Sequence, residues 1–159
     1  MKTAFKKFIP WIILVLIVGG LVAWYFISNR VTSEENANYD VKIAEAQKWY
    51  EGREYSIAMS TYYAAAELIP SRVEAFEGIV NILLDKNRME EASSILDQSA
   101  QKLSSYDQSF LYAILCEKYL ANGNDASALE TCKKGQGLGE IHQNLELALG
   151  RAYLRNGDT

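Results

Sequence analysis

The sequence predicts an all-α protein, an α-solenoid of helix–turn–helix repeats preceded by one N-terminal transmembrane helix. Two observations support this prediction. Alanines recur along the chain at the period of a helical repeat, and an uncharged apolar run near the N-terminus is long enough to cross a bilayer. A repeat of about 34 residues cannot bury its own apolar face, so neighbouring repeats are expected to stack against one another.

The N-terminal run from Phe8 to Ser28 contains 21 residues and no charge. As an α-helix it would be about 31 Å long, close to the hydrocarbon thickness of a bilayer. Trp11 and Trp24 lie near its two ends, where aromatic residues are common in membrane spans. A cleaved signal peptide is the alternative, but the run is longer than a usual signal-peptide core and ends in bulky residues. We therefore expect residues 8–28 to be an uncleaved membrane anchor.

Charge predicts the orientation of this anchor. Residues 1–7 carry three lysines, whereas only Arg30 follows closely on the other side of the span. Because basic residues stay on the cytoplasmic side, residues 1–7 should be a cytoplasmic tail and the repeats should be extracytoplasmic, that is, periplasmic or extracellular. The polar segment 29–38 is interpreted as a short linker, which would hold the repeats close to the cell membrane.

The predicted repeats occupy residues 39–159. Ala58 and Ala92 are 34 residues apart, and Ala128 follows after 36, which a two-residue insertion at Asp107 and Gln108 explains. A small residue at these positions lets the second helix of each repeat approach the first, and larger side chains one turn later fill the space beside it. The predicted boundaries are 39–72, 73–106, 109–142 and a partial repeat over 143–159.

This pattern resembles the tetratricopeptide repeat (TPR) family over residues 39–159, most closely in the third repeat and in the segment LALGRAYLRNGD of the fourth. The resemblance implies antiparallel helix pairs that stack into a superhelix, with the first helix of each pair lining a concave groove for protein segments. The whole chain is similar in layout to a membrane-anchored bacterial TPR protein.

The resemblance also implies which residues line the groove. Carried over position by position, they are Gln47, Tyr50, Glu74, Glu77, Asn81, Phe110, Glu117, Arg151 and Leu154. Some family members grip a C-terminal carboxylate with basic and amide residues, but most of those are missing here, where the matching positions hold Ile43, Gln47, Gly78, Phe110 and Ile114. The expected groove is acidic at its middle with aromatic patches, which favours a basic or partly apolar segment of a protein or peptide partner.

The sequence offers little for catalysis. The one histidine, His142, lies at a predicted turn, and no histidine or cysteine cluster has the spacing of metal ligands. All 20 acidic residues but only 13 of the 16 basic residues follow Ser28, so this part of the chain carries a net charge of −7. Such a surface repels phosphate backbones. We therefore expect no enzyme activity, no cofactor or metal, and no nucleic-acid partner.

Cys116 and Cys132 fall in the two helices of the third repeat, on faces that are expected to meet. Outside the cytoplasm they could form a disulfide. The alternative is a pair of free thiols that serve as small buried core residues. The sequence leaves both alternatives open.

The predicted function is that of a membrane-anchored TPR scaffold that mediates protein–protein interactions on the extracytoplasmic side, as an assembly factor or in a co-chaperone-like role. Two alternatives remain open. The last helix, from about Gln143 to Arg155, carries leucines on more than one side, which predicts an uncovered apolar face and self-association of a structural protein. The chain is also expected to be the N-terminal part of a longer protein, whose remaining part would be an enzyme in the second alternative.

Overall fold

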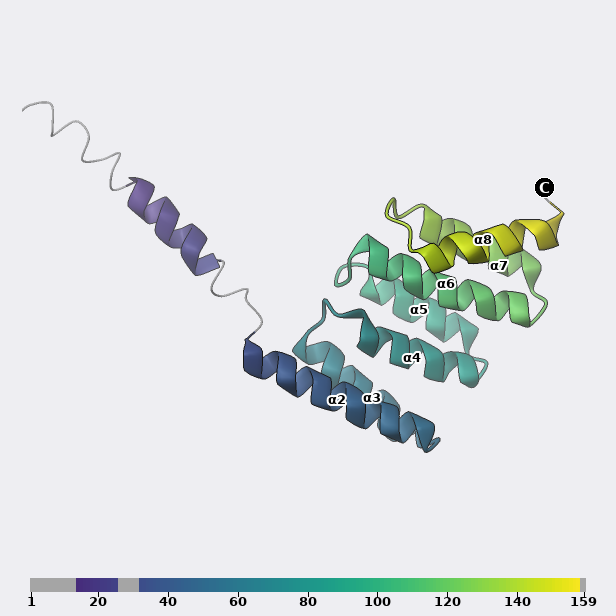
Figure 1. Cartoon of the computed structure of the whole chain (residues 1–159), viewed down its shortest axis with the longest axis horizontal. Coiled ribbons are helices and arrows are strands. Elements are labelled where there is room, and N and C mark those ends of the chain that lie inside the picture. The colour runs from purple at the N-terminus through teal and green to yellow at the C-terminus, as the bar shows by residue number, and fades with distance from the viewer. Residues whose placement is uncertain (1–13, 26–31, 158–159) are drawn as a thin grey trace, which may run out of the picture. The chain divides into compact units, whose positions relative to one another are not determined.

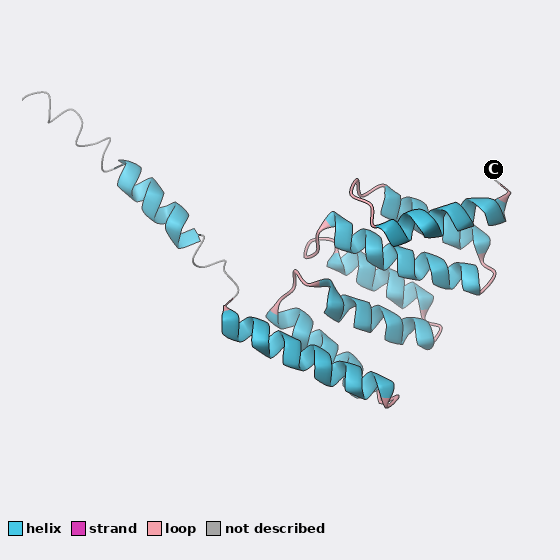
Figure 2. Ribbon diagram, in the orientation of Figure 1, coloured by secondary structure: helices cyan, strands magenta, loops and turns pink. Residues whose placement is uncertain are grey.

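Two layers of antiparallel helices form the larger part of the computed structural model, which describes residues 14–25 and 32–157. Between Ser33 and Asn156, successive helices alternate between the two layers (Figure 1). The first layer contains α2 (Ser33–Glu51), α4 (Val73–Asp85), α6 (Ser105–Ala121) and α8 (Gln143–Asn156). The second contains α3 (Tyr55–Leu68), α5 (Met89–Ser99) and α7 (Asp125–Gln136). The described residues form helices joined by loops and no strand, which confirms the all-α prediction (Figure 2).

The chain divides into two compact units, one ending at Ser33 and one beginning at Glu34. In the first unit, residues 14–25 are helical. Within the ranges 14–25 and 32–157, no helix is both long and apolar enough to cross a bilayer. Of the predicted span 8–28, residues 14–25 belong to this helix; residues 8–13 and 26–28, like the predicted tail 1–7, lie outside the described residues.

The turns inside the helical pairs share one backbone conformation and one hydrogen bond. Arg53, Asn87 and Gly123 occupy equivalent positions, and each has a positive φ, of 61°, 57° and 74°. In every turn the next residue donates its backbone N–H to the carbonyl five residues earlier, as Glu54 does to Trp49 at 2.9 Å. Gly157, with φ 80°, stands 34 residues after Gly123. The helical pairs therefore recur at the predicted spacing.

The recurring alanines lie where the two layers touch. Ala58, Ala92 and Ala128 are completely buried. The larger side chains predicted to fill the space beside them, Tyr62 and Leu96 among them, are buried as well. The helices can approach closely here because alanine carries only a methyl group. The repeat register derived from these alanines is thus the register of the packed core.

Two helices begin earlier than the repeat boundaries predict. Residues 33–38, interpreted as part of a polar linker, are the first turns of α2, where Glu34 and Glu35 favour the positive end of the helix dipole. The insertion before the third repeat is absorbed by extending α6 backwards to Ser105. The Ser104 side chain caps this extension by accepting the backbone N–H of Asp107.

Cys116 of α6 and Cys132 of α7 are joined by a disulfide, with their Cα atoms 5.6 Å apart. Of the two alternatives for this pair, the structure therefore contains the bridge. Around it lies a second core cluster, distinct from the one that fills the first two repeats. This second cluster also covers much of α8, because Leu145 and Leu149 are buried in it. The prediction of an uncovered apolar face on α8 is correct only for Leu147 and Leu154, which are 55% and 68% exposed.

Candidate functional site

The candidate site is the exposed side of α2, α4, α6 and α8, which we call the groove face. Every residue predicted to line a groove comes from these four helices. The groove face carries two hollows, one between α2 and α4 and one between α6 and α8. They occupy equivalent places two repeats apart, but the side chains that line them differ in charge.

The hollow between α2 and α4, here called the acidic hollow, has a volume of about 270 Å³. Its lining residues are Ile43, Gln47, Tyr50, Tyr62, Glu74, Glu77, Gly78 and Asn81. Five of the nine residues that the resemblance placed in the groove are therefore gathered here, from the first helices of two successive repeats: Gln47, Tyr50, Glu74, Glu77 and Asn81. Two carboxylates and no basic side chain line it.

Tyr62 is a lining residue that the sequence suggested only as a core residue. It belongs to α3, in the other layer, and its ring reaches the acidic hollow because Gly78 of α4 has no side chain. A Cβ atom at Gly78 would come within 2.3 Å of the Tyr62 ring. One sequence signal could have revealed that Tyr62 lines the hollow. It is a glycine in α4 combined with a large aromatic residue in the preceding helix.

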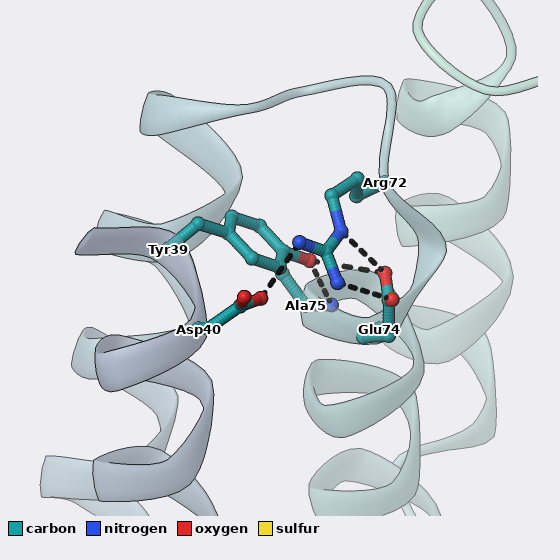
Figure 3. A network of polar contacts seen from close by, with 5 residues as sticks. All are labelled: Tyr39, Asp40, Arg72, Glu74 and Ala75. Atoms are coloured by element: carbon teal, nitrogen blue, oxygen red, sulfur yellow. Dashed lines mark hydrogen bonds and ion pairs between the residues drawn. The ribbon is translucent and has the colours of Figure 1, made fainter. Parts of the chain in front are cut away.

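The negative charge of Glu74, one of the two carboxylates, is compensated by a network of polar contacts near the N-terminal ends of α2 and α4 (Figure 3). The Arg72 guanidinium donates to Glu74 and to Asp40, each at 2.7 Å, and it also lies over the Tyr39 ring at 4.2 Å. The Tyr39 hydroxyl donates to Glu74 at 3.3 Å and accepts the backbone N–H of Ala75 at 3.1 Å. Burial raises the pKa of Glu74, but Arg72 outweighs it and holds that pKa below its ordinary value.

Glu77, the second carboxylate, is different. It is half-buried, and among the described residues it has no hydrogen bond or ion pair. Burial raises the pKa of Glu77 above its ordinary value, and the nearby charge of Glu74 raises it further. The ionised form of Glu77 is therefore held in the fold at a cost, one turn away from a carboxylate that is fully compensated.

Tyrosine and amide groups complete the acidic hollow. The Tyr50 hydroxyl donates to Asp85 at 2.7 Å, and burial together with this bond raises the Tyr50 pKa to about 12. This bond holds the ring in place between α2 and α4. The Gln47 side chain donates to Glu51 at 3.3 Å, which leaves its carbonyl oxygen available to a bound group.

The hollow between α6 and α8, here called the apolar hollow, has a volume of about 400 Å³. It is lined by Ala113, Ile114, Glu117, Asn144, Leu147 and Arg151, and a neighbouring depression adds Leu120, Ala121, Leu154 and Arg155. Its two predicted groove residues, Glu117 and Arg151, form an ion pair with each other at 2.5 Å. Their charges therefore cancel, and the remaining walls are mostly aliphatic.

Phe110 lines neither of these hollows. Its ring lies 4.9 Å from that of His142, and the Tyr106 ring lies 4.8 Å from the same imidazole. His142, which the sequence places at a turn, caps α8 by accepting the backbone N–H of Asn144 on Nδ1. The aromatic contact of Phe110 therefore serves the junction between α6 and α8.

Glu77→Gln is expected to make the protein modestly more stable at pH 7. A carboxyl whose pKa is raised by folding contributes stability that is present below its unfolded-state pKa, near 4.5, and lost as the pH rises through the folded value. Glutamine keeps the shape and removes the cost of the charge. Thermal unfolding monitored by circular dichroism from pH 3 to pH 8 measures this, and the two proteins should converge below pH 4.5. A variant less stable than the wild type at pH 7 would contradict the assignment.

Comparisons with known proteins leave the family open. A scan against protein-family models found no match, and a search of curated proteins found no similar sequence. Within residues 14–25 and 32–157, no group of three histidine, cysteine or acidic side chains is placed to hold a metal ion. The function of the groove face is therefore argued from its own geometry and charge.

Proposed function

We propose that this chain is a membrane-anchored scaffold of the TPR type whose groove face binds a segment of a partner protein outside the cytoplasm, as an assembly factor or co-chaperone-like protein would. The observation that carries the proposal is the acidic hollow. Gln47 and Tyr50 of α2 meet Glu77 and Asn81 of α4 around one recess, although they belong to two successive repeats.

The TPR assignment is supported by the repeat length and by the equivalent turns. Helical pairs of about 34 residues, close-packed through an alanine in the second helix, are characteristic of this family. Here Ala58, Ala92 and Ala128 are those alanines. A stack of such pairs presents one continuous face of first helices, which is the surface that repeat proteins use for binding.

Membrane anchoring is supported by the N-terminal sequence. Residues 8–28 carry no charge, and the helix at 14–25 exposes all of its large apolar side chains, including Leu16 and Trp24. A helix that is apolar on all sides is stable where its surroundings are apolar too, as in a bilayer. The three lysines before Phe8 favour a cytoplasmic N-terminus and extracytoplasmic repeats. A disulfide between Cys116 and Cys132 accords with an oxidising compartment.

Site-specific crosslinking in cells tests binding and topology together. A photo-crosslinking amino acid is placed in the full chain at Gln47 or Asn81 on the groove face. For the controls it replaces Ser60 or Glu67, which are exposed on the side of α3 opposite its buried residues. We expect discrete crosslinked products from the groove positions and none from the controls. These products should be digested by a protease added outside the cytoplasmic membrane.

Equal crosslinking from both sets of positions would show that the groove face is not the binding surface. Protection of the products until the membrane is broken would place the repeats in the cytoplasm and refute the proposed topology.

A further inference from the structure

The two hollows of the groove face are complementary to different side chains of a bound segment. The acidic hollow contains an uncompensated carboxylate, Glu77, and its lining residues include no lysine or arginine. The other charges around it are already satisfied, since Arg72 pairs with Glu74 and the Tyr50 hydroxyl donates to Asp85. An incoming cation would therefore pair with Glu77 without having to displace an existing partner.

The walls of the acidic hollow match a long basic side chain in shape as well. Ile43 and the rings of Tyr50 and Tyr62 provide apolar surface, on which the methylene stem of lysine or arginine can pack. Tyrosine ring faces also attract cations. The side-chain carbonyls of Gln47 and Asn81 can accept the N–H donors that Glu77 does not bind. A short carboxylate or an aliphatic side chain would leave these groups unsatisfied.

The apolar hollow has the opposite character. Its two charged lining residues, Glu117 and Arg151, form an ion pair with each other. A charged side chain from a partner would therefore gain little there. Leu147 is more than half exposed, and Ile114 lines the same hollow. Covering this surface with an aliphatic side chain removes apolar area from water, which is favourable by about 25 cal/mol per Å².

We propose that the bound segment inserts a lysine or arginine side chain into the acidic hollow and a leucine-like side chain into the apolar hollow. This inference rests on the proposed function. Packed helices lie roughly 8–10 Å apart, so two repeats separate the hollows by roughly 20 Å. An extended chain rises about 3.3 Å per residue, which places the two side chains about six residues apart.

The test uses the full chain in lipid nanodiscs and a displayed library of random twelve-residue peptides. We expect enriched peptides to carry a lysine or arginine and, about six residues away, a leucine, isoleucine or methionine. An enriched peptide is then synthesised in two forms, with lysine or with its uncharged isostere norleucine. Each form is measured against the wild type, Glu77→Gln and the control Glu67→Gln, which removes the same charge from the exposed side of α3.

Glu77→Gln should weaken binding of the lysine peptide about ten-fold or more, because it removes one partner of a partly desolvated charge pair. It should change binding of the norleucine peptide little, and Glu67→Gln should change neither. Glu77→Lys, as a second variant, should shift selection towards acidic peptides. Circular dichroism of each variant verifies that it is folded.

Three results would overturn the inference. One is enrichment without basic residues, and another is equal effects of Glu77→Gln and Glu67→Gln, which would indicate only long-range attraction to a negative protein. The third is peptide binding that competes with dimer formation, which would assign the groove to a second copy of the chain. If crosslinks from Gln47 and Asn81 still form in cells when one of these results is found, the groove face binds a partner, but not through a basic and an aliphatic side chain. If those crosslinks are missing as well, the proposed function fails together with this inference.

Discussion

Ala58→Trp and Ala128→Trp are each expected to lower the free energy of unfolding by about 3 kcal/mol, the upper end of the usual cost of overpacking a core. Both alanines are completely buried where the two helices of a repeat touch. An indole has no room at this contact unless the helices separate, and separation would also disturb the neighbouring repeat. Urea unfolding of the full chain in detergent, followed by circular dichroism, measures the effect through the shift in midpoint.

Gln47→Ala is the matched control for this prediction. Gln47 is exposed on the groove face, and among the described residues its side chain hydrogen-bonds only to Glu51 of the same helix. Its loss should change stability by no more than about 0.5 kcal/mol. Similar midpoint shifts for all three variants would mean that the alanines do not mark the contact between layers, and the repeat register would then be wrong.

Removing the disulfide is expected to cost a comparable amount. Cys116 and Cys132 are 16 residues apart. A crosslink that closes a loop of this size stabilises a protein by roughly 3 kcal/mol, chiefly by restricting the unfolded chain. The double variant Cys116→Ala, Cys132→Ala should therefore unfold at a lower urea concentration than the oxidised wild type. Alanine keeps both positions small and apolar, so the loss of the covalent link dominates the change.

The loss of stability should be local as well as global. The cysteines belong to the second core cluster, which holds α8 against α6 and α7. Amide hydrogen exchange in the double variant should accelerate in α7 and α8 more than in α3 and α4, which pack in the first cluster. Reductant should lower the stability of the wild type and leave the variant unchanged. If reductant has no effect on the wild type, the two thiols are not bridged in the protein.

Much of the groove face was predictable because helical repeats convert sequence spacing into spatial position. Once Ala58 and Ala92 are aligned, Gln47 and Asn81 fall at equivalent places on successive first helices, and the structure brings both to the acidic hollow. The repeat spacing does not predict Tyr62 as a lining residue. Its ring reaches the groove from the other layer, and the one sequence signal for this is the pairing of Gly78 in α4 with a large aromatic residue in the preceding helix.

The sequence also does not predict which of the carboxylates on the groove face have a basic partner. Glu74 and Glu77 are two acidic residues of one helix, yet only Glu74 has a basic partner. The partner, Arg72, precedes α4, and the network that orients it includes Tyr39 and Asp40 of α2. Glu117 likewise pairs with Arg151, 34 residues away. Such pairs depend on side-chain direction across a helix contact, which spacing along the chain does not specify.

The helical class, the 34-residue period and the positions of the buried alanines follow from the amino-acid sequence alone, because they depend on local backbone preference and on a pattern that repeats along the chain. Packing of the two layers fixes where α2 and α6 begin, which leucines of α8 remain exposed, and the bridge between Cys116 and Cys132. It also decided that one hollow keeps an unpaired carboxylate while the other does not. These outcomes depend on distances between residues far apart in sequence, and such distances are set only when the layers pack together.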